Sequence, residues 1–210
     1  MHSLGVLMTN ATDTVKSLYN SQEELLEGIY KLHCPNGFEV DASYGNGSFY
    51  KGSSRVPPKR FDIDSTLDNC EVADSENLPL EDSSVSSLVF DPPFLTYVRQ
   101  NRVGNGNMIM SKRFSGYWTY HDLESHYKGS LREFKRVIKK KGVVVFKCQD
   151  IVHNHRLHPT HINVINWADG FRLKDLFILS ANHRLPSPNR KGKQKHARVF
   201  HSYFLVLQRE

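Results

Sequence analysis

Cysteine is scarce in this sequence, and its three copies, Cys34, Cys70 and Cys148, lie far apart. None of them forms a Cys-x-x-Cys pair, so the spacing indicates neither a zinc finger nor a disulfide framework. This use of cysteine is typical of a reducing, intracellular compartment, and we expect a cytoplasmic location. No apolar run approaches the roughly 20 residues that a membrane-spanning helix needs, and the N-terminus lacks the basic and apolar segments of a signal peptide. We therefore expect no membrane partner.

Internal repeats and low-complexity linkers are also missing, so nothing divides the 210 residues into separate units. The length suits one domain with a full-sized core, and we expect a single domain over residues 1–210. The formal net charge of +6 is compatible with a polyanionic partner. This charge is unevenly distributed, because residues 62–91 are acidic, whereas residues 128–147 and 184–198 are rich in lysine and arginine.

Periodicity and turn residues predict strands that alternate with helices. Residues 11–33 carry an approximately helical apolar face, and Gly142–Phe146 is the continuous apolar run of a buried strand. The predicted elements are a helix at 11–33, strands at 38–41, 60–63, 71–73 and 87–91, a helix at 121–139, a strand at 142–146, a helix within 157–170, and strands at 171–179 and 200–207. This alternation predicts an α/β fold with a mostly parallel sheet flanked by helices, and the last two strands could form an antiparallel hairpin.

A glycine-bearing turn follows the first predicted strand, in the segment Phe38–Phe49. The strand delivers Asp41 to the carboxyl edge of the sheet, where open α/β sheets bind ligands, and Gly45 and Gly47 permit close approach of the backbone to a ligand. A dinucleotide fingerprint needs a small residue where Tyr50 stands, and no Lys-Ser/Thr pair follows as in a P-loop. A nucleoside without phosphate is therefore the better ligand, although a glycine turn that binds nothing also fits the pattern.

Acidic side chains also follow the next two predicted strands. Asp62 comes fifteen residues after Gly47, and a carboxylate there can accept hydrogen bonds from both hydroxyls of a ribose. Asp64 is a competing candidate, but N-capping of a helix is its simpler role. Asp74 could accept a hydrogen bond from an adenine amino group, or it could be a solvated turn residue. Acids at three strand ends along one edge favour a nucleoside site.

At these positions the sequence resembles the class I S-adenosylmethionine-dependent methyltransferases. The likeness runs over residues 36–208 and rests on three segments, Val40–Gly47, Phe61–Asp64 and Ala73–Asp82. It implies a Rossmann-like fold with a mostly parallel sheet. The stretch Ala42-Ser43-Tyr44 departs from the pattern, since many members of the family have glycine or small residues there.

The resemblance implies that S-adenosylmethionine is the cofactor and that it binds at this edge. Asp41 and the glycine turn would hold its methionine part. Asp62 would hold the ribose and Asp74 the adenine, while Ile63 would pack on the purine face. The implied cofactor-binding residues are Asp41, Ala42, Ser43, Tyr44, Gly45, Gly47, Asp62, Ile63, Asp74 and Ser75.

Asp91-Pro92-Pro93-Phe94 is the most specific motif of the sequence. It matches the Asp/Asn/Ser-Pro-Pro-aromatic signature of methyltransferases that modify planar amino nitrogens, and the chain resembles the DNA amino-methyltransferases of bacteria and phages. A conjugated amino group is a poor nucleophile, but a carboxylate beside a backbone carbonyl can accept its two hydrogens and stabilise the developing positive charge. We expect Asp91 and the Pro92 carbonyl to carry catalysis, the tandem prolines to fix the turn, and Phe94 to stack on the base. The alternative is a strand-ending proline turn with an incidental aspartate.

These motifs predict transfer of a methyl group to an exocyclic amino nitrogen of a nucleic-acid base. N6 of adenine in DNA is the first choice because an aspartate leads the motif, and N4 of cytosine is the second. An RNA base amino-methyltransferase would use the same four residues, and a non-catalytic nucleic-acid-binding subunit is the more distant alternative. Because a base inside a duplex is out of reach, we expect base flipping.

Basic clusters outside these motifs are candidates for phosphate contacts. No large target-recognition domain fits in 210 residues, so we expect recognition through the glycine-containing loop 99–116, a partner subunit or a homodimer. The predicted nucleic-acid-binding residues are Arg99, Arg102, Lys112 and Arg113 in this loop, and Arg190, Lys191, Lys193 and Lys195 in the late connection.

Four histidines, His153, His155, His158 and His161, stand close together in the sequence. No carboxylate or cysteine pattern completes a familiar metal site around them. We therefore expect no metal, and we interpret this segment as a polar loop or a phosphate contact.

Overall fold

The computed structural model describes residues 14–64, 67–96, 116–181 and 194–210. An eight-stranded sheet has the order β1-β9-β10-β6-β5-β2-β3-β4, and every pair of neighbours is parallel except the two pairs that contain β10. Its strands are β1 (Leu18–Tyr19), β2 (Val40–Asp41), β3 (Lys59–Asp62), β4 (Glu71–Val72), β5 (Val85–Phe90), β6 (Ile138–Cys148), β9 (Phe171–Ser180) and β10 (His201–Arg209). A two-stranded sheet holds β7 (Ile151–His153) and β8 (Arg156–His158). The helices are α1 (Gln22–His33), α3 (Tyr120–Val137) and α4 (Thr160–Trp167), with a 3-10 turn η2 (Ser48–Tyr50).

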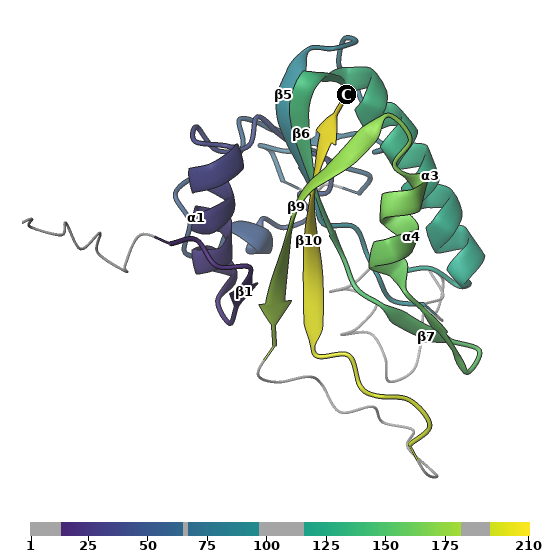
Figure 1. Ribbon diagram of the computed structural model, residues 1–210. Coiled ribbons are helices and arrows are strands. Elements are labelled where there is room, and N and C mark those ends of the chain that lie inside the picture. The colour runs from purple at the N-terminus through teal and green to yellow at the C-terminus, as the bar shows by residue number, and fades with distance from the viewer. Residues whose placement is uncertain (1–13, 65–66, 97–115, 182–193) are drawn as a thin grey trace, which may run out of the picture.

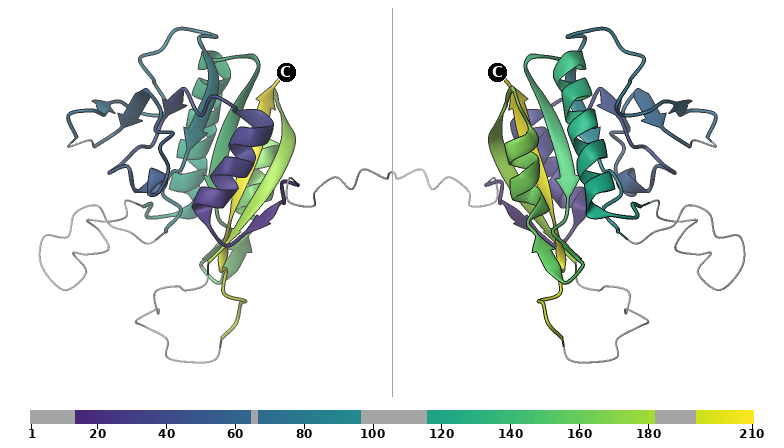
Figure 2. Two further views of the ribbon diagram at one scale, coloured as in Figure 1. Left: turned by 90° about the vertical axis from the view of Figure 1, so that its left-hand side faces the viewer. Right: turned by 90° about the vertical axis from the view of Figure 1, so that its right-hand side faces the viewer.

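Helix α1 covers one face of the sheet, and α3 and α4 cover the other (Figures 1 and 2). Leu88 and Phe90 of β5 belong to the hydrophobic cluster that contains the buried side chains of α3, whereas Val89 belongs to the cluster that contains those of α1. Strands β6 and β10 alternate in the same way, because successive side chains of a strand point to opposite faces. The central strands are therefore packed on both sides, which fixes the positions of their ends.

The observed sheet confirms the predicted α/β fold, with its mostly parallel strands and its antiparallel C-terminal hairpin. Strands β9 and β10 pair from Ser180 with His201 to Phe171 with Arg209. In the connections that join β2, β3, β4 and β5, however, the described residues form η2 and turns rather than α-helices. None of the helices in the described ranges is long and apolar enough to span a bilayer.

The predicted helix at 11–33 is wrong in its first part, because α1 begins only at Gln22. The side chain of Ser21 caps this helix by accepting a hydrogen bond from the backbone N–H of Glu24 at 3.4 Å. Leu18 and Tyr19 instead form β1 and pair with β9. The exposed edge of β9 offers unpaired backbone groups, and this pairing outweighs a helical periodicity that is only approximate.

The helix predicted to end at residue 139 ends earlier, at Val137, and β6 begins at Ile138. The basic run Lys139–Lys141 therefore lies in a strand rather than at a helix end. Ile138 is fully buried and pairs with Val85 of β5, so contact with the sheet ends α3 before the lysines. Gly142 allows the strands to approach, since a Cβ there would lie 2.9 Å from the backbone oxygen of Ser86. The predicted strand at 142–146 is therefore the middle of a longer one.

Candidate active site

Four carboxylates lie at the carboxyl edge of the sheet, which is the lower edge in Figure 1. Strands β4, β3, β2, β5 and β6 are parallel neighbours, so their carboxyl ends meet at this edge. Asp41 ends β2, Asp62 ends β3 and Asp91 directly follows β5. Asp74 follows the short edge strand β4. The structure thus brings the predicted cofactor acids and the predicted catalytic acid to one side of the molecule.

The glycine turn after β2 folds onto the end of β3. The backbone N–H of Gly45 donates a hydrogen bond to Asp62 Oδ2 at 2.8 Å, and that of Tyr44 donates to the Phe61 carbonyl at 2.9 Å. Gly45 and Gly47 have φ angles of 54° and 75°, which residues with a side chain rarely adopt. The turn therefore depends on both glycines.

Asp41 lies behind this turn, fully buried. Its Oδ2 accepts a hydrogen bond from the Tyr50 hydroxyl at 2.6 Å, and its Oδ1 accepts one from the backbone N–H of Ser43 at 2.8 Å. Burial, with a smaller contribution from the nearby Asp91, raises the pKa of Asp41 to about 7. Tyr50, which replaces the small residue of a dinucleotide fingerprint, is thus the side chain that holds this carboxyl group.

The residues predicted to bind the ribose and the purine, Asp62 and Ile63, lie next to the glycine turn. Asp62 accepts one backbone hydrogen bond on each oxygen, from Gly45 and from Asp64, the latter at 3.1 Å. Carboxylate oxygens have two lone pairs each, so both can accept a further hydrogen bond. The side chain of Ile63 is 68% exposed beside it. Asp64 caps no helix within the described ranges, so the capping role considered for it has no structural support there.

At the predicted adenine end, Asp74 lies in a turn and the adjacent Ser75 is tied to α3. Asp74 Oδ1 accepts a hydrogen bond from the backbone N–H of Glu76 at 2.9 Å. The hydroxyl of Ser75 is 2.8 Å from His126 Nε2, and the Tyr117 hydroxyl is 2.5 Å from the other ring nitrogen. Burial lowers the pKa of His126, so the ring is held neutral between two hydroxyls. Asp74, Glu76 and His126 come within 4.8 Å of one another, but both nitrogens of His126 already have partners.

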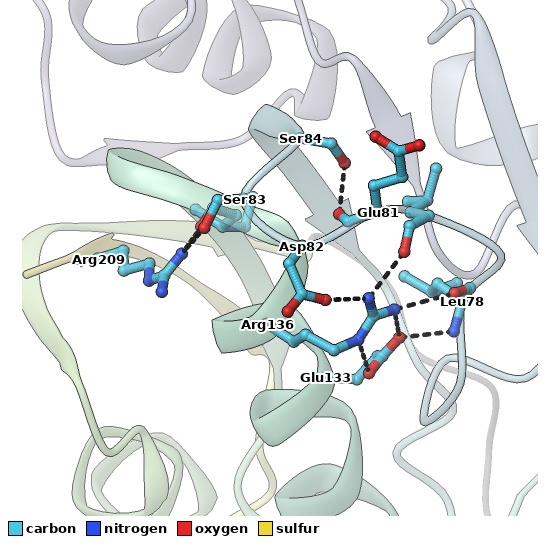
Figure 3. A network of polar contacts seen from close by, with 10 residues as sticks. Leu78, Glu81, Asp82, Ser83, Ser84, Glu133, Arg136 and Arg209 are labelled. Carbon is cyan, nitrogen blue, oxygen red and sulfur yellow. Dashed lines mark hydrogen bonds and ion pairs between the residues drawn. The ribbon is translucent and has the colours of Figure 1, made fainter.

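Arg136 fixes the chain between Asp74 and β5, as Figure 3 shows. Its guanidinium donates to the carbonyls of Leu78 and Leu80 at 3.1 and 2.8 Å, and to Asp82 at 2.7 Å. Glu133 pairs with it at 2.5 Å and also accepts the backbone N–H of Leu78 at 2.8 Å. The segment before β5 is therefore clamped to α3.

The Asp-Pro-Pro-Phe turn is held from two sides. The backbone N–H of Asp91 donates to Ser43 Oγ in the glycine turn at 2.7 Å. On the other side, the buried Tyr127 of α3 donates its hydroxyl hydrogen to the carbonyl of Pro93 at 2.9 Å. Pro92 is buried, and Phe94 is half-buried against the cluster around α3. The predicted catalytic turn thus sits directly against the predicted cofactor turn.

Lys147 is the main residue of this site that sequence reasoning missed. Its Nζ lies 3.0 Å from Asp91 Oδ2 and 3.1 Å from Gln22 Oε1, and the rings of Phe49 and Phe204 lie about it at 5.2 and 5.4 Å. The side chain is only 12% exposed. A lone lysine at the end of an apolar strand was the available signal, but its partner could not be known before the order of the strands.

The predicted nucleic-acid contacts lie mostly outside the described residues. This holds for Arg99, Arg102, Lys112, Arg113, Arg190, Lys191 and Lys193. Lys195 is described, and it is exposed. Three aromatic residues lie around the start of α3: Tyr117 and Tyr120 are largely buried, whereas Trp118 is 45% exposed.

No protein-family model matches this sequence, and no match was found among curated proteins. Among solved structures, the chain is similar to a proposed type 11 methyltransferase from Sulfolobus solfataricus, with 20% identity over 91% of this chain and 93% of that one, and a TM-score of 0.50. It is also similar to TrmN from Thermus thermophilus, with 14% identity over 90% of this chain and 49% of that one, and a TM-score of 0.52. A proposed DNA modification methylase, also from Thermus thermophilus, is 17% identical over 72% of this chain and 53% of that one, with a TM-score of 0.43. The chain therefore spans about half the length of the last two proteins. At these identities the likeness establishes the architecture, and the chain has the Rossmann-like fold of class I methyltransferases.

Proposed function

We propose that this chain is an S-adenosylmethionine-dependent methyltransferase that modifies an exocyclic amino nitrogen of a nucleic-acid base, N6 of adenine in DNA. The observation that carries the proposal is the 2.7 Å hydrogen bond from the Asp91 backbone to Ser43 Oγ. It joins the Asp-Pro-Pro-Phe turn to the glycine turn, so a cofactor on one turn would face an acceptor on the other. The proposal treats residues 1–210 as one methyltransferase domain.

The residues at the edge fit the cofactor. The positive φ angles of Gly45 and Gly47 leave room for close approach to the backbone. Asp62 retains lone pairs for the ribose hydroxyls, and Asp74 can accept the adenine amino group, while the exposed Ile63 offers an apolar surface to the purine. When bound, S-adenosylmethionine supplies an electrophilic methyl group. Among the remaining proposed contacts, Ala42, Ser43 and Tyr44 lead from β2 into the glycine turn, Ser75 follows Asp74, and Asp41 braces the glycine turn from behind.

Asp91 and the carbonyl of Pro92 are proposed to accept the two hydrogens of the target amino group. Asp91 Oδ2 is engaged by Lys147, and among the described residues no partner is recorded for Oδ1. Oδ1 is therefore the oxygen available to the substrate. Acceptors that are already in place when positive charge grows on the nitrogen stabilise the transition state more than the ground state. Phe94 would stack on the flipped base.

Target recognition is proposed to come from residues outside the two turns. The loop 99–116 and the late connection carry the basic side chains named above, which suit phosphate contacts. A partner subunit or a second copy of the chain in a homodimer would supply any further contacts needed to recognise the target sequence.

Tritiated methyl transfer from S-adenosylmethionine to duplex DNA and to RNA, followed by nucleoside analysis, tests the proposal. We expect label in N6-methyladenine from DNA, and Asp91→Ala is the matched control. Label in N4-methylcytosine would instead indicate a cytosine-N4 DNA methyltransferase, and label in RNA would indicate an RNA base amino-methyltransferase. Nucleic-acid binding without methyl transfer would support the non-catalytic subunit instead. Calorimetry that detects no binding of S-adenosylmethionine by the wild-type chain would refute the methyltransferase assignment itself.

A further inference from the structure

The β7–β8 hairpin extends beyond the carboxyl end of β6, at the edge that carries Asp91 (Figure 1). Its turn consists of Asn154 and His155, which have φ angles of 49° and 59°. Two successive residues with positive φ make the tight hairpin connection that suits the twist of paired strands. The hairpin is therefore a defined structural unit, whereas the sequence predicted a polar loop or a phosphate contact there.

One side of this hairpin is anchored to the body of the protein. The ring of His158 stacks on Tyr120 at the start of α3, with 3.8 Å between ring centroids. Ile151 and His153 are buried. Asn154, His155 and Arg156 are exposed, so the anchored side fixes the direction in which the tip faces the solvent.

A second basic segment lies against the hairpin tip. The Nε2–H of His196 donates a hydrogen bond to the carbonyl of His155 at 2.9 Å. This contact places the exposed Lys195 beside the tip, and Arg198 follows two residues after His196. We call His155, Arg156, Lys195, His196 and Arg198 together the hairpin surface.

The hairpin surface has no carboxylates of its own to neutralise it. The sequence contains no aspartate or glutamate between positions 151 and 168, or between positions 176 and 209. Asp150, which precedes the hairpin, is engaged by His161 at 2.7 Å. Within the described part of the chain, neither Arg156 nor Lys195 has a recorded ion pair. Exposed positive charge without an ion pair among the described residues, as at Arg156 and Lys195, is suited to a polyanion.

We propose that the hairpin surface binds the phosphodiester backbone of the nucleic acid whose base enters the site at Asp91. The proposal rests on the proposed function for its substrate class. Lys147 touches Asp91, and the tip at Asn154 lies only seven positions further along the chain. An extended chain of that length spans at most about 25 Å, or roughly seven phosphates along one strand. The tip is therefore within reach of phosphates close to a base held at Asp91.

The test compares the salt dependence of DNA binding for two double variants. Arg156→Gln/Lys195→Gln removes two charges from the hairpin surface. Lys140→Gln/Lys141→Gln removes two exposed charges at the amino end of β6, on the opposite edge. Fluorescence anisotropy with labelled duplex DNA gives the slope of log K against log salt, which falls by about 0.9 for each lost phosphate contact. We expect the magnitude of this slope to fall by about 2 in Arg156→Gln/Lys195→Gln and to stay unchanged in Lys140→Gln/Lys141→Gln. Arg156→Lys keeps the charge and should keep the wild-type slope.

The outcomes separate this inference from the proposed function. Equal slopes in wild type and Arg156→Gln/Lys195→Gln, or equal losses in both double variants, would overturn the hairpin surface even if the wild type methylates DNA. If only Arg156→Gln/Lys195→Gln loses slope and the wild type transfers no methyl group, the result would support DNA binding by the hairpin surface and refute the proposed methyltransferase activity. Duplex DNA and RNA of the same sequence are measured in parallel to identify the phosphodiester source. Competition by vesicles of anionic lipid as strong as that by DNA would also overturn the inference.

Discussion

The ion pair between Asp91 and Lys147 predicts that activity and stability will separate when its charges are removed. Lys147 Nζ is 3.0 Å from Asp91 Oδ2, and the two side chains are 12% and 24% exposed. At an effective dielectric constant of about 20, unit charges at this distance attract by roughly 5 kcal/mol before desolvation is counted. Breaking a buried pair by removing one partner costs about 3–5 kcal/mol, because the other charge is left uncompensated. Since this pair is partly exposed, we expect about 3 kcal/mol for either single variant.

Asp91→Ala should therefore lower both stability and rate. The unpaired Lys147 would remain between two aromatic rings with Gln22 as its recorded partner. The lost acceptor should reduce the rate of single-turnover methyl transfer by about a hundred- to a thousandfold. Asp91→Asn should be milder in both respects, because its amide oxygen can accept a hydrogen bond from Lys147 or from the substrate.

The double variant Asp91→Ala/Lys147→Met should regain most of the lost stability but none of the lost rate. Methionine keeps the length and apolar character of the lysine stem between Phe49 and Phe204, and replacing both charges of a buried pair by apolar groups is often neutral. Because each single variant loses about 3 kcal/mol and the double variant loses little, a coupling free energy of about 5 kcal/mol between the two positions would then appear in the stability cycle.

Urea denaturation measures the stability of the four proteins, and single-turnover transfer with saturating cofactor and DNA measures the rate. Asp169→Ala is a matched control, because its exposed ion pair with Lys135 should contribute little. Additive stability losses in the double variant would show that Asp91 and Lys147 do not interact as described. A wild-type rate in Asp91→Ala would mean that Asp-Pro-Pro-Phe is only a strand-ending turn.

Three further predictions concern the rest of the site. Asp62→Ala should weaken a micromolar affinity for S-adenosylmethionine by tenfold or more in calorimetry, because the ribose loses a charged acceptor; an unchanged affinity would remove Asp62 from the site. Burial raises the pKa of Asp41 to about 7 in the folded state, so the wild type should lose stability relative to Asp41→Asn as the pH rises from about 4 to about 7, by up to roughly 4 kcal/mol. Urea denaturation of both proteins across this pH range measures the difference in their stability, and a difference that does not change with pH would contradict the prediction. Phe94→Ala should weaken placement of the flipped base by roughly 1–3 kcal/mol, seen as a higher KM for DNA with unchanged cofactor affinity; an unchanged KM would argue against stacking.

The line of acids at the carboxyl edge could be predicted from the sequence because it follows from local rules. Asp41, Asp62 and Asp91 each lie near the carboxyl end of a predicted strand, and parallel strands carry their carboxyl ends to one edge. The glycine turn and the tandem prolines are equally local, since they act through the φ angles of their own residues. For this reason the fold and the positions of these turns agree with the prediction.

Element boundaries depended instead on contacts between distant segments. Leu18 and Tyr19 belong to a helical pattern in the sequence, but they pair with Ile178 and Leu179, which lie far along the chain. The lysines after Ile138 resemble a helix end, yet the pairing of Ile138 with Val85 places them in β6. Periodicity describes one segment at a time and contains no information about such partners.

Local patterns in the chain set which chemical groups lie at the ends of the strands, whereas strand order and packing set which of these groups touch. Lys147 meets Asp91 only because β6 lies beside β5 in register, and Tyr50 meets Asp41 only because η2 turns back over β2. The contact of His196 with His155 joins segments 41 positions apart. Side-chain identity is a local property, whereas an ion pair or a hydrogen bond requires a distance of about 3 Å that only strand order and packing can set.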